Sequence, residues 1–503
     1  MSTLRDIVGR GRLAEPHRPW PRVIVSETRW RLAMAELSAA RATLVSLWGE
    51  PAAVHMAMLA GNGDTAVVTL ECPEGHFPSV GAMHAPAIRL ERAIHDLYGL
   101  EPRGAPDTRP WLDLGFWGIE YPLGARRARQ PPGAYAFLPV EGENLHQIPV
   151  GPVHAGIIEP GHFRFTANGE TVVRLEARLG YVHKGIDALM TGASLDKAAQ
   201  LAGRTSGDST VAYSIAFARA VEAALDIEAP PRAHYLRALM AELERLANHF
   251  GDIGAICNDA SFSILHAQFG ILRERTLRTA EACFGHRLMM DRVVPGGVAV
   301  DLAGDGLGQL RWLLANVRRR LPELVEIYDN TASLQDRTVT TGVLKPPLAR
   351  QFGAGGYVGR ASGRAFDARR ALTYSPYHEL TFDVPTFSEG DVNARVWVRI
   401  REVEQSLALI EQIAARLPGG AIRIEVDPIG SRPREGLALV EAFRGDVFAW
   451  TRIGADGLVA RCHLRDPSWF QWPLLEAVIE GNIVADFPLC NKSFNCSYSG
   501  HDL

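Results

Sequence analysis

The stretch that decides the fold is "PPRAHYLRALMAELERLANHFGDIG", residues 230–254. Prolines open it, and Gly251 is expected to end it. Its apolar side chains recur every three or four residues, which predicts a helix that buries one face in a core. These side chains are Leu236, Leu239, Met240, Leu243, Leu246, Ala247 and Phe250.

The sequence on either side of this helix predicts an α+β protein with two unequal parts. Helical patterns dominate from about residue 190 to 330 and return at 394–417, whereas 42–48 and 65–72 are β-rich. The segment "GARRARQPPG" (124–133) has the composition of a linker. We therefore expect a small α/β domain (1–123), a linker (124–150) and a large, mainly helical domain (151–503). Peripheral β-hairpins are expected in the large domain at 151–185 and 445–466.

Composition excludes several classes of protein. The net charge of −4 over 503 residues gives no reason to expect a nucleic-acid partner. No run approaches 18 apolar residues, and the first residues lack the apolar stretch of a secretory signal. The six cysteines contain no CxxC pair and do not suggest a disulfide framework. We expect a cytoplasmic protein with reduced thiols.

Three groups of polar residues are candidates for chemistry. His154, Glu159 and His162 share a Gly/Pro-rich loop, where histidines suit proton delivery, although a solvated surface loop would look the same. On the 230–254 helix, an acid, a cation and a histidine at i, i+3 and i+7 could face one cavity or could be exposed helix charges. Around "GRTSGDST" (203–210), hydroxyls and charged groups could bind a ligand or simply cap a helix. The residues of the last two groups are Glu242, Arg245, His249, and Arg204, Ser206, Ser209 and Tyr213.

Common nucleotide and hydrolase motifs are missing. The chain has no GxGxxG after a strand, no GxxxxGK[ST] and no GxSxG. The residues alone therefore indicate a soluble multi-domain protein with a possible polar site.

Ordered segments of the chain resemble a known family. They are "GPVHAGIIEPGHFRF" (151–165), "GYVHKGIDALM" (180–190), "ELERLANHFGDIG" (242–254), "VVPGGV" (293–298), "GRASGRAFDARR" (359–370) and "RCHLRDPSWF" (461–470). Together they resemble the large subunit of membrane-bound energy-converting [NiFe] hydrogenases of the formate hydrogenlyase and hydrogenase-4 type. They also resemble the homologous quinone-site subunit of complex I. "LERAIHDLYGL" (90–100) and "WLDLGFWGIEYPL" (111–123) resemble the complex I peripheral subunit that is often fused ahead of it.

The resemblance implies a hydrogenase-large-subunit-like fold without the metal ligands. The family's first cysteine pair falls on Ser206 and Ser209, and its second falls on Ser497 and Gly500. Hydroxyls do not replace thiolates on soft metals at neutral pH, and glycine offers no ligand. We therefore expect no hydrogenase activity. The last stretch, "CNKSFNCSYSGHDL" (490–503), is instead expected to plug the former metal cavity with the side chains of Asn495, Tyr498, His501 and Asp502.

The resemblance also implies a role for the remaining polar residues. In complex I, the cavity that corresponds to the hydrogenase metal site holds a quinone headgroup instead, and the quinone takes electrons from a neighbouring iron–sulfur cluster. His154 and His162 would then donate protons, with Tyr213 as the alternative. Arg204 would lie beside the partner's cluster. Asp208 could replace a family tyrosine that is missing here, and Glu242, Arg245 and His249 would be further cofactor contacts.

The family further implies partners and a location. We expect no cofactor bound by this chain, a quinone as the possible substrate, and NAD(H) bound only by partner subunits. The expected partners are a small iron–sulfur subunit, a ferredoxin-like subunit, and membrane antiporter-like and anchor subunits, with no nucleic acid. The chain would sit peripherally on the cytoplasmic face of the inner membrane. The alternative is a non-catalytic scaffold that docks the iron–sulfur subunit to membrane subunits.

Overall fold

A computed structural model describes residues 3–15, 17–128, 134–154 and 158–503. The N-terminal part is built on a five-stranded sheet in the order β1-β3-β6-β5-β4. The turn between β5 and β6 forms because Gly63 adopts φ +87° and the Asn62 side chain accepts a hydrogen bond from the Asp64 amide. The elements of this part are α1 (Leu4–Gly9), β1 (Arg12–Leu13), β3 (Arg22–Val25), α2 (Glu27–Ser38), β4 (Ala42–Glu50), β5 (Ala53–Ala60), β6 (Thr65–Glu71), β7 (His76–Pro78), η1 (Ala85–Ala87), α3 (Ile88–Tyr98) and β8 (Glu101–Arg103).

Helix α3 packs tightly against strand β4. A Cβ atom at Gly49 would lie 2.9 Å from the ring of Tyr98 and 3.0 Å from Ile94, so only glycine allows this approach. The helix ends at Gly99, which has φ +74°. The strands expected at 42–48 and 65–72 are confirmed.

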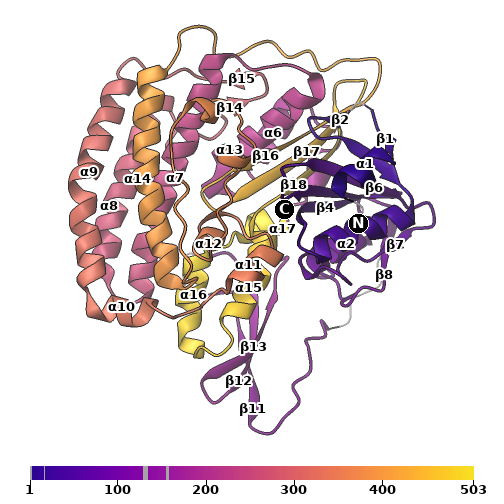
Figure 1. The fold of residues 1–503 in the computed structure, drawn as a ribbon, viewed down its shortest axis with the longest axis horizontal. Helices are drawn as coiled ribbons and strands as arrows, with labels where there is room; N and C mark the ends of the chain where they lie inside the picture. Colours follow the sequence, from indigo (N-terminus) through magenta and orange to yellow (C-terminus); the bar gives the residue numbers. More distant parts are fainter. Residues whose placement is uncertain (1–2, 16, 129–133, 155–157) are drawn as a thin grey trace.

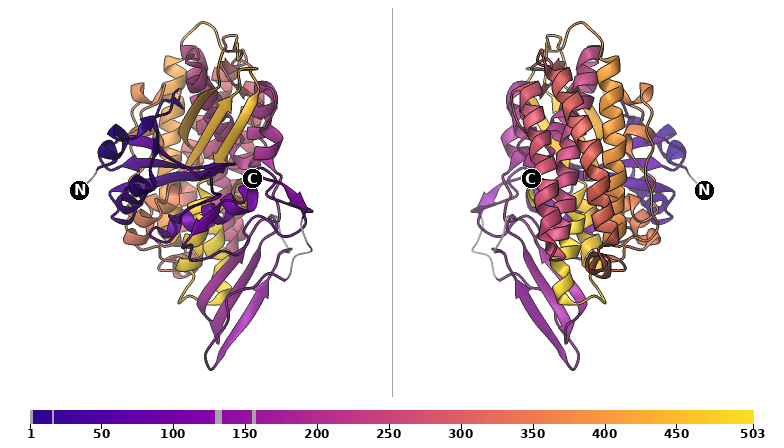
Figure 2. Two further views of the ribbon diagram at one scale, coloured as in Figure 1. Left: turned by 90° about the vertical axis from the view of Figure 1, so that its right-hand side faces the viewer. Right: turned by 90° about the vertical axis from the view of Figure 1, so that its left-hand side faces the viewer.

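Long helices form the opposite side of the molecule (Figure 1). Here α7 packs along α8, with α14 on its other side (Figures 1 and 2). Their apolar stripes meet in one core, in which Leu236, Leu243 and Phe250 are fully buried. The helices are α7 (Pro231–Asp259), α8 (Ser263–Phe284), α9 (Gly306–Asn330) and α14 (Val392–Arg416).

The predicted end of the deciding helix is wrong. Helix α7 does not stop at Gly251 but continues to Asp259. Its glycines face α8, where a Cβ at Gly254 would lie 3.1 Å from the Cβ of Phe269. These glycines therefore permit a close helix–helix approach rather than marking a helix end.

A second sheet joins the two parts of the chain. Its order is β18-β17-β16-β2, and β2 comes from the N-terminal part and pairs with β16 in parallel. Helix α6 lies so close to this sheet that Gly436 has no space for a Cβ against the backbone of Ala220. The elements are β2 (His17–Arg18), α6 (Thr210–Leu225), β16 (Arg434–Glu441), β17 (Asp446–Ile453) and β18 (Val459–Arg465).

A three-stranded antiparallel sheet projects from the body (Figures 1 and 2). It contains the expected hairpin, β12 (His162–Asn168) and β13 (Thr171–Arg178), and also β11 (Leu145–Val150). Residues 145–150, expected at the end of the linker, are thus a strand paired with β12. Earlier in that range, β10 (Arg127–Ala128) pairs with β9 (Ile119–Glu120), and 129–133 lie outside the described residues.

The remaining elements are short and lie between or beside these layers. None of the helices within the described ranges is both long and apolar enough to cross a membrane. They are α4 (Ile186–Met190), α5 (Leu195–Ala202), η2 (Gly207–Ser209), β14 (Val293–Val294), β15 (Gly297–Val298), α10 (Ala332–Thr338), α11 (Pro346–Gln351), α12 (Gly356–Arg360), α13 (Ala368–Ala371), η3 (Tyr377–Glu379), α15 (Ser468–Val478), η4 (Val484–Asp486), α16 (Phe487–Phe494) and α17 (Tyr498–Asp502).

Candidate functional site

The positions that the family resemblance assigns to metal ligands come together in the fold. Ser206, just before η2, and Ser497, just before α17, are both buried, and their Oγ atoms lie 2.9 Å apart. Ser497 Oγ also accepts a hydrogen bond from the Gly500 amide at 2.9 Å and so caps α17. The backbone amide of Ser497 donates to Ser468 Oγ at 2.8 Å. Hydroxyl pairing therefore closes this place, which we name the serine joint (Ser206, Ser209, Ser497 and Gly500).

A buried arginine completes the serine joint. Arg444 donates to Asp208 Oδ2 at 2.6 Å and to Ser209 Oγ at 3.2 Å, and it also donates to the Asn495 carbonyl. Asp208 Oδ1 accepts from Ser206 Oγ at 2.7 Å. Burial acts to raise the pKa of Asp208, but the charge of Arg444 and the serine hydrogen bonds outweigh it and hold that pKa below its ordinary value.

Ser209 does not cap helix α6 with its side chain, contrary to one expectation. The first turn is capped instead by Glu244 of α7, which accepts from the amides of Val211 at 2.7 Å and Ala212 at 3.1 Å. Burial raises the pKa of Glu244 to about 8. No local sequence signal announces this cap, because the carboxylate comes from a different helix.

Tyr213 lies beside the serine joint but is already paired. Its hydroxyl donates to Asp466 Oδ2 at 2.7 Å, and its side chain is fully buried. Burial and the neighbouring carboxylate raise the pKa of Tyr213 well above its ordinary value, so it stays a phenol. The same Asp466 oxygen would lie 2.5 Å from a Cβ at Gly500, which leaves no room there for a cysteine side chain.

The last residues form the expected polar plug. His501 Nδ1 lies 2.8 Å from Asp502 Oδ1, and Trp111 Nε1 donates to His501 Nε2 at 3.2 Å. This donation places the imidazole proton on Nδ1, facing the carboxylate. Trp469 stacks on the His501 ring at 4.1 Å between centroids. Asn495 donates to Asp252 at 2.8 Å, and Tyr498 is also buried.

The segment that carries His154, Glu159 and His162, which we name the early loop, packs against this plug. His154 Nε2 lies 2.7 Å from the Gly161 carbonyl, and His162 Nδ1 lies 3.2 Å from the Gly151 carbonyl. Glu159 accepts from the Ser499 amide at 2.9 Å, so the loop is tied to α17. His162 is buried, which lowers its pKa, and its Nε2 has no hydrogen-bond partner among the described residues. Residues 155–157 of this loop lie outside the described residues.

The three polar residues of α7 are completely buried, so the alternative of exposed helix charges is wrong. Glu242 accepts from Arg369 at 2.8 Å, from Tyr377 at 2.8 Å and from Ser406 at 2.7 Å. His249 Nε2 lies 2.7 Å from Glu402 Oε2, and burial lowers the pKa of the imidazole. Arg245 donates to the carbonyls of Glu441 and Ala442.

These residues belong to a buried ionic network that sequence reasoning missed. Arg360 donates to Glu402 at 2.7 Å and to Glu441 at 2.9 Å, while Arg369 pairs with Asp367 at 2.6 Å. Burial and the neighbouring Asp367 raise the pKa of Glu441 above its ordinary value. The network binds α7, α13, α14 and β16 together through side chains that are buried between these elements. The segment "GRASGRAFDARR" (359–370) carried the only sequence signal for it.

Arg204, two residues before Ser206, has its side chain partly at the surface. Its side chain is 41% exposed and donates to Asp291 Oδ2 at 2.8 Å. The hydrogen bond to Asp291 raises the pKa of Arg204 further. The residue is therefore reachable from outside but is already paired within its own chain.

The donor set of the serine joint does not fit a nickel–iron centre. Three hydroxyls and a glycine stand at the four positions, and the hydroxyls are hydrogen-bonded to one another and to Asp208. The nearest thiol in the sequence, Cys496, is buried, and burial raises its pKa far above neutrality, so it stays protonated. The four positions therefore offer no thiolate to hold a soft metal.

Comparisons with known proteins agree with this architecture. The model of the respiratory-chain NADH dehydrogenase 49 kDa subunit matches residues 261–438, and that of the 30 kDa subunit matches residues 42–127. Formate hydrogenlyase subunit 5 of Escherichia coli (strain K12) is 34% identical over 87% of this chain and 79% of its own length. Hydrogenase-4 component G of the same organism is 33% identical over 85% of this chain and 76% of its own length.

Two further relatives are a C/D fusion protein and a polypeptide from a solved membrane complex. The C/D fusion protein of the NADH-quinone oxidoreductase of Phocaeicola vulgatus is 28% identical over 80% of this chain and 81% of its own length. A solved polypeptide of the membrane-bound sulfane sulfur reductase, an archaeal respiratory membrane complex, is 27% identical with a TM-score of 0.68, and covers 73% of this chain and 100% of its own length. The chain therefore belongs to the family that unites the complex I 49 kDa subunit with the large subunits of hydrogenase-4 and formate hydrogenlyase, here with a 30 kDa-type domain ahead of it, and is a subunit of a respiratory-type oxidoreductase.

Proposed function

We propose that this chain is the docking core of a membrane-associated respiratory complex, and that its serine joint is a structural closure rather than a catalytic centre. The observation that carries the proposal is the 2.9 Å contact between Ser206 and Ser497, since it fills the place where relatives with cysteines would hold metal. Redox cofactors would then be held by partner subunits.

The proposed partners follow from the relatives. They are a small iron–sulfur subunit, a ferredoxin-like subunit, and membrane anchor and antiporter-like subunits, met at the cytoplasmic face of the membrane. The surface position of Arg204 suits a contact with the iron–sulfur subunit, because a cation near a cluster favours its reduced form. NAD(H) would take part only through other subunits.

A second candidate function is proton-coupled electron transfer to a quinone-like acceptor beside the early loop. It is favoured by one observation: His154, in the loop before β12, and His162, the first residue of β12, lie 2.7 Å and 3.2 Å from backbone carbonyls rather than from carboxylates. A histidine in such a place can deliver a proton to a quinone oxygen. Tyr213 suits this role less well, because its hydroxyl already donates to Asp466.

The test uses the intact complex purified from membranes, with quinone reduction measured per assembled complex. Arg444→Met removes the cation that holds Asp208, Ser209 and the Asn495 carbonyl. If the chain is a docking core, the Arg444→Met variant yields less assembled complex, but each complex that does assemble reduces quinone at the wild-type rate. Exposed Arg311→Ala on α9 serves as the control and should change neither quantity.

His154→Ala separates the two candidates. The docking core predicts an unchanged rate per complex, whereas the quinone candidate predicts a loss of at least tenfold together with an altered pH profile, while the complex keeps all its subunits. A per-complex loss in Arg444→Met, or stoichiometric nickel in the wild-type complex, would contradict the closed serine joint.

A further inference from the structure

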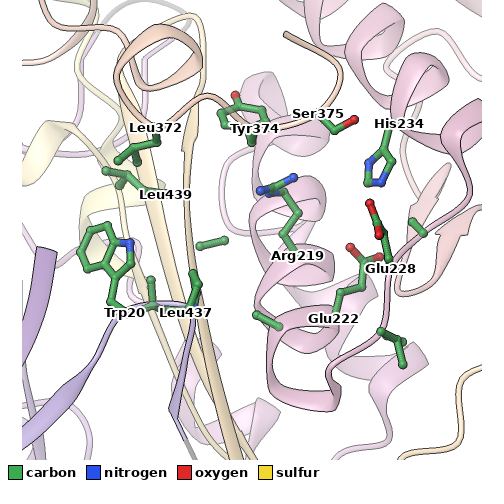
Figure 3. Close-up of a pocket in the computed structure, with 15 residues that line it drawn as sticks. Trp20, Arg219, Glu222, Glu228, His234, Leu372, Tyr374, Ser375, Leu437 and Leu439 are labelled. Atoms are coloured by element: carbon green, nitrogen blue, oxygen red, sulfur yellow. The ribbon is translucent and has the colours of Figure 1, made fainter. Parts of the chain in front are cut away.

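A pocket of about 510 Å³ lies between helix α6, the edge of strand β16 and the segment that follows β2 (Figure 3). It is separate from the serine joint and from the buried ionic network. Strand β2 covers β16 only at Glu435 and Gly436, so the next residues of β16 border the pocket instead of a neighbouring strand. Its volume falls in the range of sites that bind small organic molecules.

Arg219 gives the pocket an uncompensated positive charge. Among the described residues none forms a hydrogen bond or ion pair with its guanidinium, whose Nε is buried without a partner. The ring of Tyr374 lies 4.6 Å from the guanidinium carbon. Burial lowers the pKa of Arg219 from its ordinary value. A guanidinium removed from water normally finds an acceptor, so this one is poised to take an acceptor from a ligand.

The acidic residues of the pocket do not neutralise Arg219. Glu222 is engaged by Arg237 through hydrogen bonds of 2.6 Å and 3.0 Å and also accepts from the Gly296 amide. Glu228 is exposed at the pocket rim. Glu222 and Glu228 thus line the same pocket, but no carboxylate among the described residues forms an ion pair or hydrogen bond with Arg219.

A second buried group in the pocket, His234, has one nitrogen without a hydrogen-bond partner. His234 is 8% exposed, and its Nε2 is buried without a hydrogen bond to any described residue. Burial lowers the pKa of His234 to about 4, so the ring is neutral at pH 7. Its single N–H is used by the hydrogen bond to the Ala229 backbone, so the free Nε2 can accept a hydrogen bond but cannot donate one. Figure 3 shows His234, Glu222 and Glu228 on one side of Arg219.

The other side of the pocket is apolar. Trp20, Leu372, Leu437 and Leu439 lie together on the side of Arg219 away from His234 (Figure 3). A guanidinium beside an indole and leucines is complementary to a molecule with one anionic end and an apolar body. Such a molecule would satisfy the guanidinium and bury its hydrocarbon at the same time.

We propose that this pocket binds a small amphipathic monocarboxylate, with its carboxylate on Arg219 and its hydrocarbon along Trp20, Leu437 and Leu439. The assignment is independent of the docking role proposed above, because none of these residues belongs to the serine joint or to the early loop.

Calorimetric titration of the full chain with octanoate and with octanamide tests the proposal, both well below concentrations that form micelles. The amide has the same hydrocarbon and a neutral acceptor, so the pair isolates the charge. We expect octanoate to bind at least tenfold more tightly than octanamide. Arg219→Gln should weaken octanoate binding at least tenfold and leave octanamide nearly unchanged, while Arg219→Lys should retain part of the preference.

Two controls keep the test decisive. Arg311→Gln changes an exposed arginine on α9 and should bind octanoate like the wild type. Trp20→Ala should weaken both probes, since it removes the apolar wall. Absence of octanoate binding by the wild type, equal affinity for both probes, or unchanged binding by Arg219→Gln would each overturn the proposal. If Arg219→Gln does not fold, the two probes on the wild type and the Arg219→Lys variant still decide.

Discussion

At the scale of single residues, Gly500 sets how much space the serine joint has, and restoring a cysteine there should destabilise the protein. The new Cβ would lie 2.5 Å from Asp466 Oδ2 and 2.9 Å from Ser497 Oγ, so α17 or Asp466 must move. We expect Gly500→Cys to cost about 1–3 kcal/mol, as for other overpacked sites, measured as a lowered thermal midpoint. Gly419→Cys, where a Cβ meets nothing within 4 Å, is the matched control. Equal midpoints for the two variants would show that the serine joint has room for a thiol.

His84 should make the protein sensitive to acid. It is buried, and burial lowers its pKa to about 4 from an ordinary value of 6.5. Because the folded state resists protonation more than the unfolded state, the stability contribution is complete above pH 6.5 and is lost as the pH falls toward 4. The shift corresponds to about 3 kcal/mol at most. His84→Phe should therefore lose less stability than the wild type between about pH 7 and pH 4.5 in urea unfolding, and parallel losses would refute the assignment.

The residues of the serine joint could be located from the sequence, but what holds them could not. The family pattern is enough to recognise that Ser206, Ser209 and Ser497 stand where cysteines would be. Arg444, whose guanidinium binds Ser209 and the adjacent Asp208, comes from a turn 235 residues away from Ser209. Candidate residues are thus predictable from a local motif, whereas their partners depend on tertiary structure.

At the scale of elements, periodicity predicted helix faces well and helix ends poorly. The stripe of α7 is buried as expected, but Gly251 and Gly254 lie within the helix because they face α8. The same periodicity could not reveal that Glu242, Arg245 and His249 are buried, since their partners come from α13, α14 and β16. A glycine or a charge in a helix gives no sign of which neighbour it will meet.

Two glycine variants test this interpretation of the helix pair. In Gly254→Val the new Cβ would lie 3.1 Å from the Cβ of Phe269, and the two valine methyl groups need further space. This variant should lower stability by about 2 kcal/mol. Gly270→Ala on α8 has nothing within 4 Å of its new Cβ, and should raise stability by about 0.5–1 kcal/mol through helix propensity. Both are measured by chemical unfolding. A stabilising Gly254→Val would mean that α7 and α8 are not closely packed there.

At the scale of the whole molecule, a shared sheet joins the N-terminal segment to the rest of the chain. Strand β2 from the first part completes the sheet of the second, and 145–150 of the expected linker forms a strand. A chain of ion pairs crosses the same boundary, in which Arg452 binds Glu50 at 2.8 Å and Glu435 at 2.8 Å. The α+β class and the hairpins could be predicted from local patterns, whereas this boundary could not, because strand pairing over such distances leaves no local signal.

Arg452→Met tests the importance of this boundary. It leaves Glu50 and Glu435 largely buried with less compensation, and we expect a loss of about 3 kcal/mol, as when one partner of a buried ion pair is removed. Limited proteolysis should then cut between the two parts faster than in the wild type. Arg401→Met, in an exposed i,i+3 pair with Glu404, is the control and should change little. Unchanged proteolysis of Arg452→Met would show that the shared sheet alone holds the parts together.

The serine joint and the plug also constrain the order in which the protein can be made. Ser206 meets a partner 291 residues later in the chain, and Trp111 meets one 390 residues later. At a translation rate of about 5–20 residues per second, the interval between the synthesis of each residue and that of its partner is tens of seconds. The contacts of the serine joint and the plug therefore form last, after the long helices have been made. Until residues 497–502 have been synthesised, the polar groups that they contact lack these partners in the ribosome-bound chain.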